Sequence, residues 1–155
     1  MTHDLKLAWA THGEASEMAA VHALAFPRPW DAEAFEDLLD EEGVFGFLAR
    51  DGAVAGLVLC RVAADEMEVL TIGVDPAARR KGVARALMSA ALGAAAQAGA
   101  STCFLEVAVD NHSAAALYAS LGFRRAGLRK GYYDRGPEGR VDALVMRLDL
   151  NAAPA

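Results

Sequence analysis

The chain has 155 residues, of which 54% are hydrophobic and 23% charged, with a formal net charge of -6. A chain of this length can bury a core without disulfide or metal support, so we expect one domain over residues 1–150 and a disordered tail at 151–155. The acidic balance argues against nonspecific nucleic-acid binding. No apolar run approaches the roughly 20 residues of a membrane helix, and the start lacks a secretory signal. We therefore expect a cytoplasmic protein without nucleic-acid or membrane partners.

The N-terminal third is expected to form a strand and then two helices. Residues 5–11 alternate apolar and polar side chains, as strands do, and apolar positions after Gly13 recur at helical spacing until residues 26–30 interrupt them. Asp31 suits the N-cap of a second, short helix, which we expect Gly43 to end.

The remaining pattern predicts a mixed α/β sheet. Two apolar runs, 44–49 and 53–62, flank an Asp-Gly pair, which is a strong signal for a hairpin. Further strands are expected at 67–74, 102–109 and 141–148, and helices at 82–97 and 113–121. Because the early strands connect through turns and the later ones through helices, antiparallel and parallel pairing should share one sheet.

Residues 79–84, with the sequence RRKGVA, lie between a predicted strand and a predicted helix. Free backbone N–H groups at a helix start form an anion site that the helix dipole strengthens, and small residues let phosphates approach closely. The glycine patterns of a P-loop and of a dinucleotide fold do not occur. The alternative is a basic helix start without a ligand, although cations there oppose the dipole. The segment thus indicates a pyrophosphate on another carrier.

The pattern Arg79-x-x-Gly82-x-Ala84 resembles the Gln/Arg-x-x-Gly-x-Gly/Ala signature of the GCN5-related N-acetyltransferases, the GNAT family. Other segments recur in order and spacing as in its ribosomal-protein-alanine N-acetyltransferase (RimI-type) subgroup; they are residues 70–76, 105–107, 111, 116–118, 121–123, 132–133 and 142–146. The resemblance covers about residues 5–149. It implies a mostly antiparallel central sheet of about seven strands with splayed central strands, flanked by about four helices.

The resemblance also implies that the coenzyme is acetyl-CoA, the acyl donor, held between strands 67–74 and 102–109. The residues implied to bind it are Ile72, Gly73, Val74, Arg80, Lys81, Gly82, Val83, Ala84, Arg85 and Asn111. Asn111 could equally cap the helix that follows it. The four histidines lack metal-ligand spacing, so no metal is expected.

Glu106 is the one charged residue in the apolar run 103–109, where a carboxylate must be paired or face a cleft. The resemblance implies that it is the general base, and Glu68 on the neighbouring predicted strand is the alternative base. An α-ammonium group, with a pKa near 7.8, loses its proton for about 3 kcal/mol less than a lysine near 10.4. An α-amine is therefore the easier acceptor.

Tyr118 shares a helical face with apolar residues, so a core tyrosine is one interpretation. The resemblance implies instead the general acid that protonates the departing thiolate. Trp30, Phe35, Tyr132 and Tyr133 resemble elements that shape an acceptor groove, although aromatic residues in such places serve equally often in packing. We expect the two tyrosines to lie in a loop.

Together these features and the resemblance predict direct acetyl transfer from acetyl-CoA to a protein N-terminus, and the resemblance implies the N-terminal alanine of ribosomal protein S18 as the acceptor. One alternative is a small-molecule amine, such as a polyamine, antibiotic or amino acid, and another is a catalytically silent acyl-CoA-binding module. Ala108 and Asp110 depart from the subgroup, which often has Arg and Ser there. These departures concern the acceptor more than the chemistry.

Overall fold

The computed structural model describes residues 5–150, so the predicted tail at 151–155 lies outside the described residues. Within that range the strands are β1 (Lys6–Trp9), β2 (Val44–Asp51), β3 (Ala53–Ala63), β4 (Glu66–Val74), β5 (Thr102–Ala108), β6 (Arg124–Asp134) and β7 (Arg140–Asp149). The helices are α1 (Ala15–Ala25), α2 (Ala32–Leu39), α3 (Val83–Gln97) and α4 (His112–Ser120). One seven-stranded sheet runs in the order β1-β2-β3-β4-β5-β7-β6. Every neighbouring pair is antiparallel except β4 and β5. This confirms the predicted fold class.

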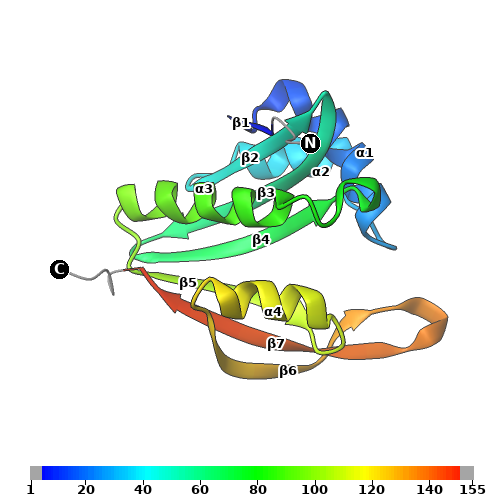
Figure 1. Cartoon of the computed structure of the whole chain (residues 1–155), viewed down its shortest axis with the longest axis vertical. Helices are drawn as coiled ribbons and strands as arrows, with labels where there is room; N and C mark the ends of the chain where they lie inside the picture. The colour runs from blue at the N-terminus through cyan, green and yellow to red at the C-terminus, as the bar shows by residue number, and fades with distance from the viewer. Residues whose placement is uncertain (1–4, 151–155) are drawn as a thin grey trace.

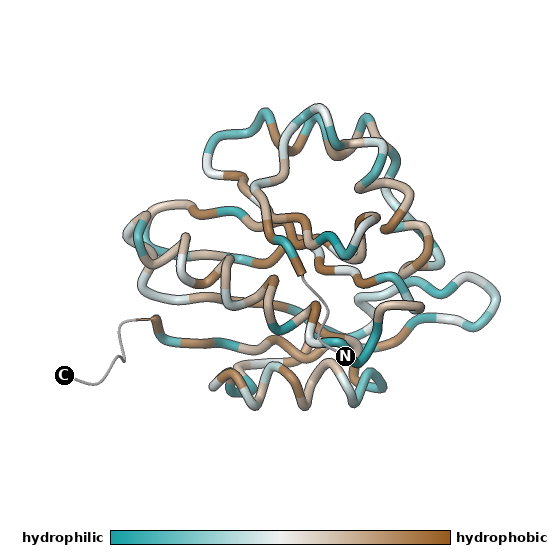
Figure 2. Tube along the Cα trace, turned by 45° about the horizontal axis from the view of Figure 1, so that its top comes forward, coloured by the Kyte–Doolittle hydropathy of each residue, from teal (hydrophilic) through white to brown (hydrophobic). Residues whose placement is uncertain are grey.

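The helices cover the sheet on both faces (Figure 1). Met18 of α1 and Phe35 of α2 are fully buried in a cluster with Leu57 of β3, whereas Leu87 of α3 lies in a separate cluster with Val58. Successive strand residues thus pack against opposite helix layers. Each such side chain contributes about 2 kcal/mol when fully buried. Hydrophobic residues accordingly follow the strands, and hydrophilic ones gather in the connections (Figure 2).

The sheet opens between β4 and β5, which start side by side and then diverge (Figure 1). Their parallel pairing covers only Glu66–Glu68 against Thr102–Phe104. On its other edge β4 carries a bulge, because Leu59 pairs with Thr71 and Cys60 with Val69, which leaves Leu70 as an extra residue. A bulge bends its strand, so the wedge-shaped opening follows from local backbone geometry. The predicted splay of the central strands is present.

Two local predictions were wrong. The sequence pattern indicated no strand at β6, because none of its residues is buried and its apolar alternation is weak. Tyr132 and Tyr133 lie in this strand rather than in a loop. Helix α2 ends at Leu39, and Gly43 does not terminate it. Gly43 has a φ of 82° and leads into β2, where a Cβ would collide with the carbonyl oxygen of Val62.

The Asp31 cap of α2 is confirmed, since its Oδ1 accepts a hydrogen bond of 2.9 Å from the N–H of Ala34. The predicted hairpin of β2 and β3 also forms, with Gly52 at a φ of 78° in its turn. Between residues 5 and 150, no helix has the length and apolar character needed to cross a membrane.

Candidate active site

The start of α3 has the geometry of an anion site. Gly82 is the N-cap at a φ of 77°, in a position where a Cβ would meet nothing within 4 Å. The first intrahelical bond runs from the N–H of Ala86 to the carbonyl of Gly82. The N–H groups of residues 82–85 therefore precede the helical ladder, and among described residues no side chain caps them and no acidic residue occupies the first turn. They form an open cradle of positive dipole ends.

Arg80, in the loop before this helix, has a φ of 67°. A left-handed conformation costs a non-glycine residue about 1 kcal/mol, which is the kind of strain that gathers at functional loops. The side chain of Arg85 is engaged elsewhere: it donates a 2.6 Å hydrogen bond to Ser120 Oγ and so joins α3 to α4 across the opening of the sheet. The backbone N–H of Arg85 remains part of the cradle.

Ile72, Gly73 and Val74 follow the bulge in β4, beyond the last pair that β4 makes with β5. Strand N–H groups on that edge consequently face the opening. Gly73 leaves little room for a side chain, because a Cβ would lie 3.0 Å from the ring of Phe26 and 3.3 Å from the Ala25 methyl group. The end of α1 is thus seated directly on β4.

A cleft of about 450 Å³ lies between the two halves of the sheet. It brings together the predicted residues Trp30, Ile72, Glu106, Asn111, Tyr118, Tyr132 and Tyr133. Phe35 is not among them: it is fully buried, and its ring lies 5.6 Å from that of Trp30. Its expected place in the acceptor groove is wrong, because α2 turns it into the core beneath the groove.

Glu106 projects from β5 into this cleft with a side chain that is 22% exposed. Tyr132 Oη donates a 3.2 Å hydrogen bond to Oε1, and Tyr133 Oη donates one of 3.1 Å to the backbone carbonyl. Arg129 Nε lies 3.0 Å from Oε2, but its N–H is not aligned as a hydrogen bond, and Oε2 is buried without one. A buried carboxylate oxygen is costly unless it is paired, and the guanidinium of Arg129 supplies that pairing for Oε2.

Glu68, the alternative base, lies in a second cleft of about 440 Å³ that Glu106 also borders. Arg61 donates a 3.2 Å hydrogen bond to Glu68 and another of 2.6 Å to Glu41. Both carboxylates thus have an arginine beside them, and what separates the two is that Glu68 does not line the cleft that holds Tyr118.

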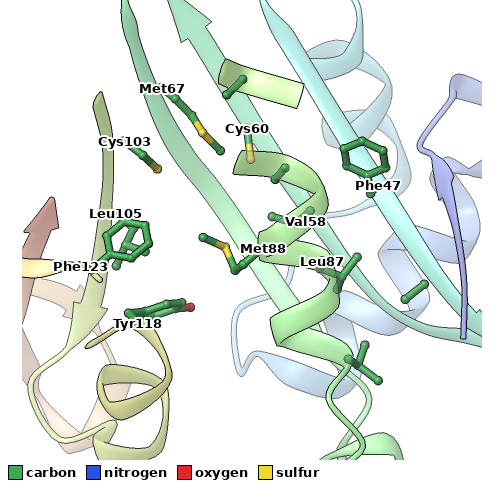
Figure 3. Close-up of a cluster of buried hydrophobic side chains, with 14 of the residues drawn as sticks. Phe47, Val58, Cys60, Met67, Leu87, Met88, Cys103, Leu105, Tyr118 and Phe123 are labelled. Atoms are coloured by element: carbon green, nitrogen blue, oxygen red, sulfur yellow. The ribbon is translucent and has the colours of Figure 1, made fainter. Parts of the chain in front are cut away.

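Tyr118 belongs both to the core and to the cleft. It is 6% exposed, and its ring lies 5.9 Å from that of Phe123. In Figure 3 its hydroxyl points away from Leu105 and Phe123, toward the side of Met88 on α3. Burial raises the pKa of Tyr118 to about 12, which keeps the phenol protonated at neutral pH.

Asn111 caps α4, because its Oδ1 accepts a 3.3 Å hydrogen bond from the N–H of Ala114. The helix-capping role that the sequence offered as an alternative for Asn111 is therefore present. The residue also lines the cleft, so its amide group lies within reach of a ligand there.

Sequence reasoning missed two side chains of the cleft region. Arg129 from β6 sets a guanidinium beside Glu106, although the subgroup's arginine is absent at Ala108. His22 lines the cleft and is 2% exposed. The available signal was a lone histidine at an apolar spacing of the first predicted helix, for which the sequence indicated no role beyond the lack of metal-ligand spacing.

Comparison with known proteins bears on this geometry. A profile of the acetyltransferase (GNAT) family matches residues 13–123. The chain belongs to this family. The [ribosomal protein bS18]-alanine N-acetyltransferase of Escherichia coli K12 is 35% identical over 123 residues, which cover 79% of this chain and 82% of the relative. The predicted family and the predicted enzyme class, an acyl-CoA-dependent N-acetyltransferase, are thereby confirmed.

Solved structures agree with this assignment. The crystal structure of the ribosomal-protein-S18-alanine N-acetyltransferase from Escherichia coli superposes with a TM-score of 0.87 at 30% identity, covering 97% of this chain and 96% of that chain. Arabidopsis thaliana NAA60, crystallised with acetyl-CoA, has a TM-score of 0.82 at 18% identity and covers 95% of this chain and 99% of its own. The second likeness concerns the fold alone.

Proposed function

We propose that this GNAT enzyme transfers the acetyl group of acetyl-CoA to the α-amine of a protein N-terminus in the cytoplasm, with the N-terminal alanine of ribosomal protein S18 as acceptor. One observation carries the proposal: Glu106, a carboxylate on β5, lines the same cleft as the phenol of Tyr118 on α4. The similarity to enzymes named for the S18 alanine supports the choice of acceptor.

The chain's own groups fit the coenzyme. The open cradle of residues 82–85 suits its pyrophosphate, and the edge of β4 at residues 72–74 offers N–H groups to the pantetheine and the thioester carbonyl. Asn111 contributes a side-chain amide at the cleft wall. The coenzyme supplies an acetyl group activated as a thioester.

Glu106 accepts a proton from the acceptor ammonium, which frees the nitrogen lone pair for attack on the thioester carbonyl. The N–C bond forms, the C–S bond breaks, and the β4 N–H groups stabilise the charge on the carbonyl oxygen. Tyr118 gives its proton to the departing thiolate, and the second proton that the nitrogen loses as it becomes an amide passes through solvent and restores the phenol. Burial raises the pKa of Tyr118 to about 12, so the phenol holds its proton until the thiolate forms, and burial also disfavours a bare thiolate in the cleft.

Mass spectrometry tests the proposal with peptides that begin with the S18 N-terminal sequence, incubated with enzyme and acetyl-CoA. A gain of one acetyl group on the α-amine is expected. Acetylation of polyamines or free amino acids in place of the peptide would favour the small-molecule alternative, and coenzyme binding without any turnover would favour the silent binding module.

A further inference from the structure

His22 on α1 makes both ring contacts and hydrogen bonds to its surroundings. Its ring stacks on Phe26 at 4.3 Å and on Trp30 at 5.0 Å, and it meets the edge of Phe35 at 5.4 Å. Both of its nitrogens are also hydrogen-bonded, to Trp30 and to Thr71. The imidazole therefore joins the segment between α1 and α2 to the bulge of β4.

These hydrogen bonds have a fixed direction. The backbone N–H of Trp30 can only donate, so it assigns Nδ1 of His22 as the acceptor at 3.0 Å. The ring is neutral because burial lowers the pKa of His22 to about 4. Its one proton must then lie on Nε2, which donates to Thr71 Oγ1 at 2.9 Å.

Thr71 is consequently an acceptor toward His22 and still has its own hydroxyl proton to give. The residue is 8% exposed, lines the main cleft and follows the extra residue of the bulge. Within residues 5–150 no acceptor is recorded for this proton. A nearly buried donor without an acceptor is destabilising, and an oxygen atom of a ligand in the cleft would accept its hydrogen bond.

The face of the sheet on which the Thr71 side chain lies indicates which ligand accepts this hydrogen bond. Thr71 reaches toward α1 and the segment that follows it, whereas the pyrophosphate cradle belongs to α3 on the opposite face. Oxygen atoms of the acceptor are thus the nearer partners. In a peptide N-terminus, the first carbonyl oxygen is close to the reacting amine.

We propose that Thr71 is a specificity-determining residue that donates a hydrogen bond to the first carbonyl oxygen of a peptide acceptor, and that His22 is its positioning residue. This role rests on the proposed acetylation of protein N-termini. It separates a peptide α-amine from a lysine side chain or a polyamine, because neither has a carbonyl beside its amine. A site built to bond a polar group rejects analogues that lack it.

The test pairs enzyme variants with two acceptors: an alanine-initiated peptide, and the same peptide with its first carbonyl replaced by methylene. Thr71→Val keeps the shape and removes the donor. It should lower kcat/KM for the normal peptide about tenfold and leave the methylene analogue within about twofold of its wild-type value. Thr71→Ser should restore most of the rate, and His22→Gln should also reduce the preference for the carbonyl-bearing peptide.

Equal losses on both acceptors would overturn the role of Thr71 while leaving the proposed function intact. A rise in the KM for acetyl-CoA as the main effect would also overturn it, since the donor would then serve the thioester. If wild-type enzyme acetylates small amines but no peptide, the proposed function fails and this role fails with it. Thermal unfolding and acetyl-CoA binding of each variant check that the fold is retained.

Discussion

The coenzyme cradle and the acceptor cleft are built in different ways. The cradle consists of consecutive backbone N–H groups at residues 82–85, fixed by one left-handed glycine and the start of one helix. The cleft around Glu106 depends on side chains from β5 and β6, with partners that are 26 and 27 residues apart in sequence. A short sequence segment can specify the cradle, whereas the cleft forms only when the whole sheet is assembled. Changes in the cradle should therefore affect coenzyme binding, and changes in the cleft should affect turnover or acceptor choice.

Glu106→Gln should cause the largest loss. The amide keeps the shape but cannot accept the ammonium proton, so kcat should fall about 10²–10³-fold. Coenzyme binding should stay within about twofold, because the cradle is untouched. Glu68→Gln is the matched control, since Glu68 borders only the second cleft. A larger loss in steady-state kinetics for that control would move the base role to Glu68.

His22 should make stability depend on pH. Its pKa of about 4 lies below the ordinary 6.5, so the unfolded chain binds more protons between these values. The free energy of unfolding should be highest above pH 6.5 and should fall by about 3 kcal/mol as the pH drops to 4. Urea unfolding at several pH values should show this slope in wild-type protein. In His22→Gln the fall in the free energy of unfolding between pH 6.5 and 4 should be about 3 kcal/mol smaller, and an unchanged fall would contradict the assignment.

Tyr118→Phe should lower kcat about 10–100-fold and leave the coenzyme dissociation constant nearly unchanged, because the ring packing is kept. With a pKa of about 12, the phenol stays protonated through pH 10. The wild-type rate should therefore show no decline between pH 8 and 10 from this group. A decline near pH 9 that Tyr118→Phe abolishes would show that the phenol ionises earlier.

Gly82→Ala should have the smallest effect, confined to the coenzyme. Its φ of 77° costs an alanine about 1 kcal/mol, so the KM for acetyl-CoA should rise a few-fold while kcat persists. Gly93→Ala, inside α3 with open space around it, should instead stabilise the helix by about 0.5–1 kcal/mol and leave the KM unchanged. If both variants had the same KM for acetyl-CoA, the start of α3 would not be the site that binds the coenzyme.

The sequence predicted most of the fold because strands and helices have local periods. It predicted the hairpin at Gly52, the Asp31 cap and the long helix at residues 82–97. Strand β6 was not predicted, because a largely exposed edge strand does not need the apolar alternation that marks a half-buried strand.

The candidate site was predictable only in part. Glu106 drew attention as a charge in an apolar strand, and Gly82 as a small residue at a helix start. The partners of Glu106 could not be predicted, because Arg129 and Tyr132 reach it through the pairing of β6 with β7 and of β7 with β5. His22 was missed because one sequence does not distinguish a buried histidine that orders a network from one that only packs.

The short pairing of β4 with β5 has a consequence for exchange of backbone hydrogens with solvent. Three residue pairs join the two strands, so amides that face the opening beyond Glu68 and Phe104 have no hydrogen bonds from the opposite strand. Those amides should exchange with deuterium faster than their neighbours that face β3 or β7. Acetyl-CoA bound in the opening would accept hydrogen bonds from these amides, as a neighbouring strand would. The amides of β4 and β5 whose exchange then slows would show how deeply the coenzyme enters.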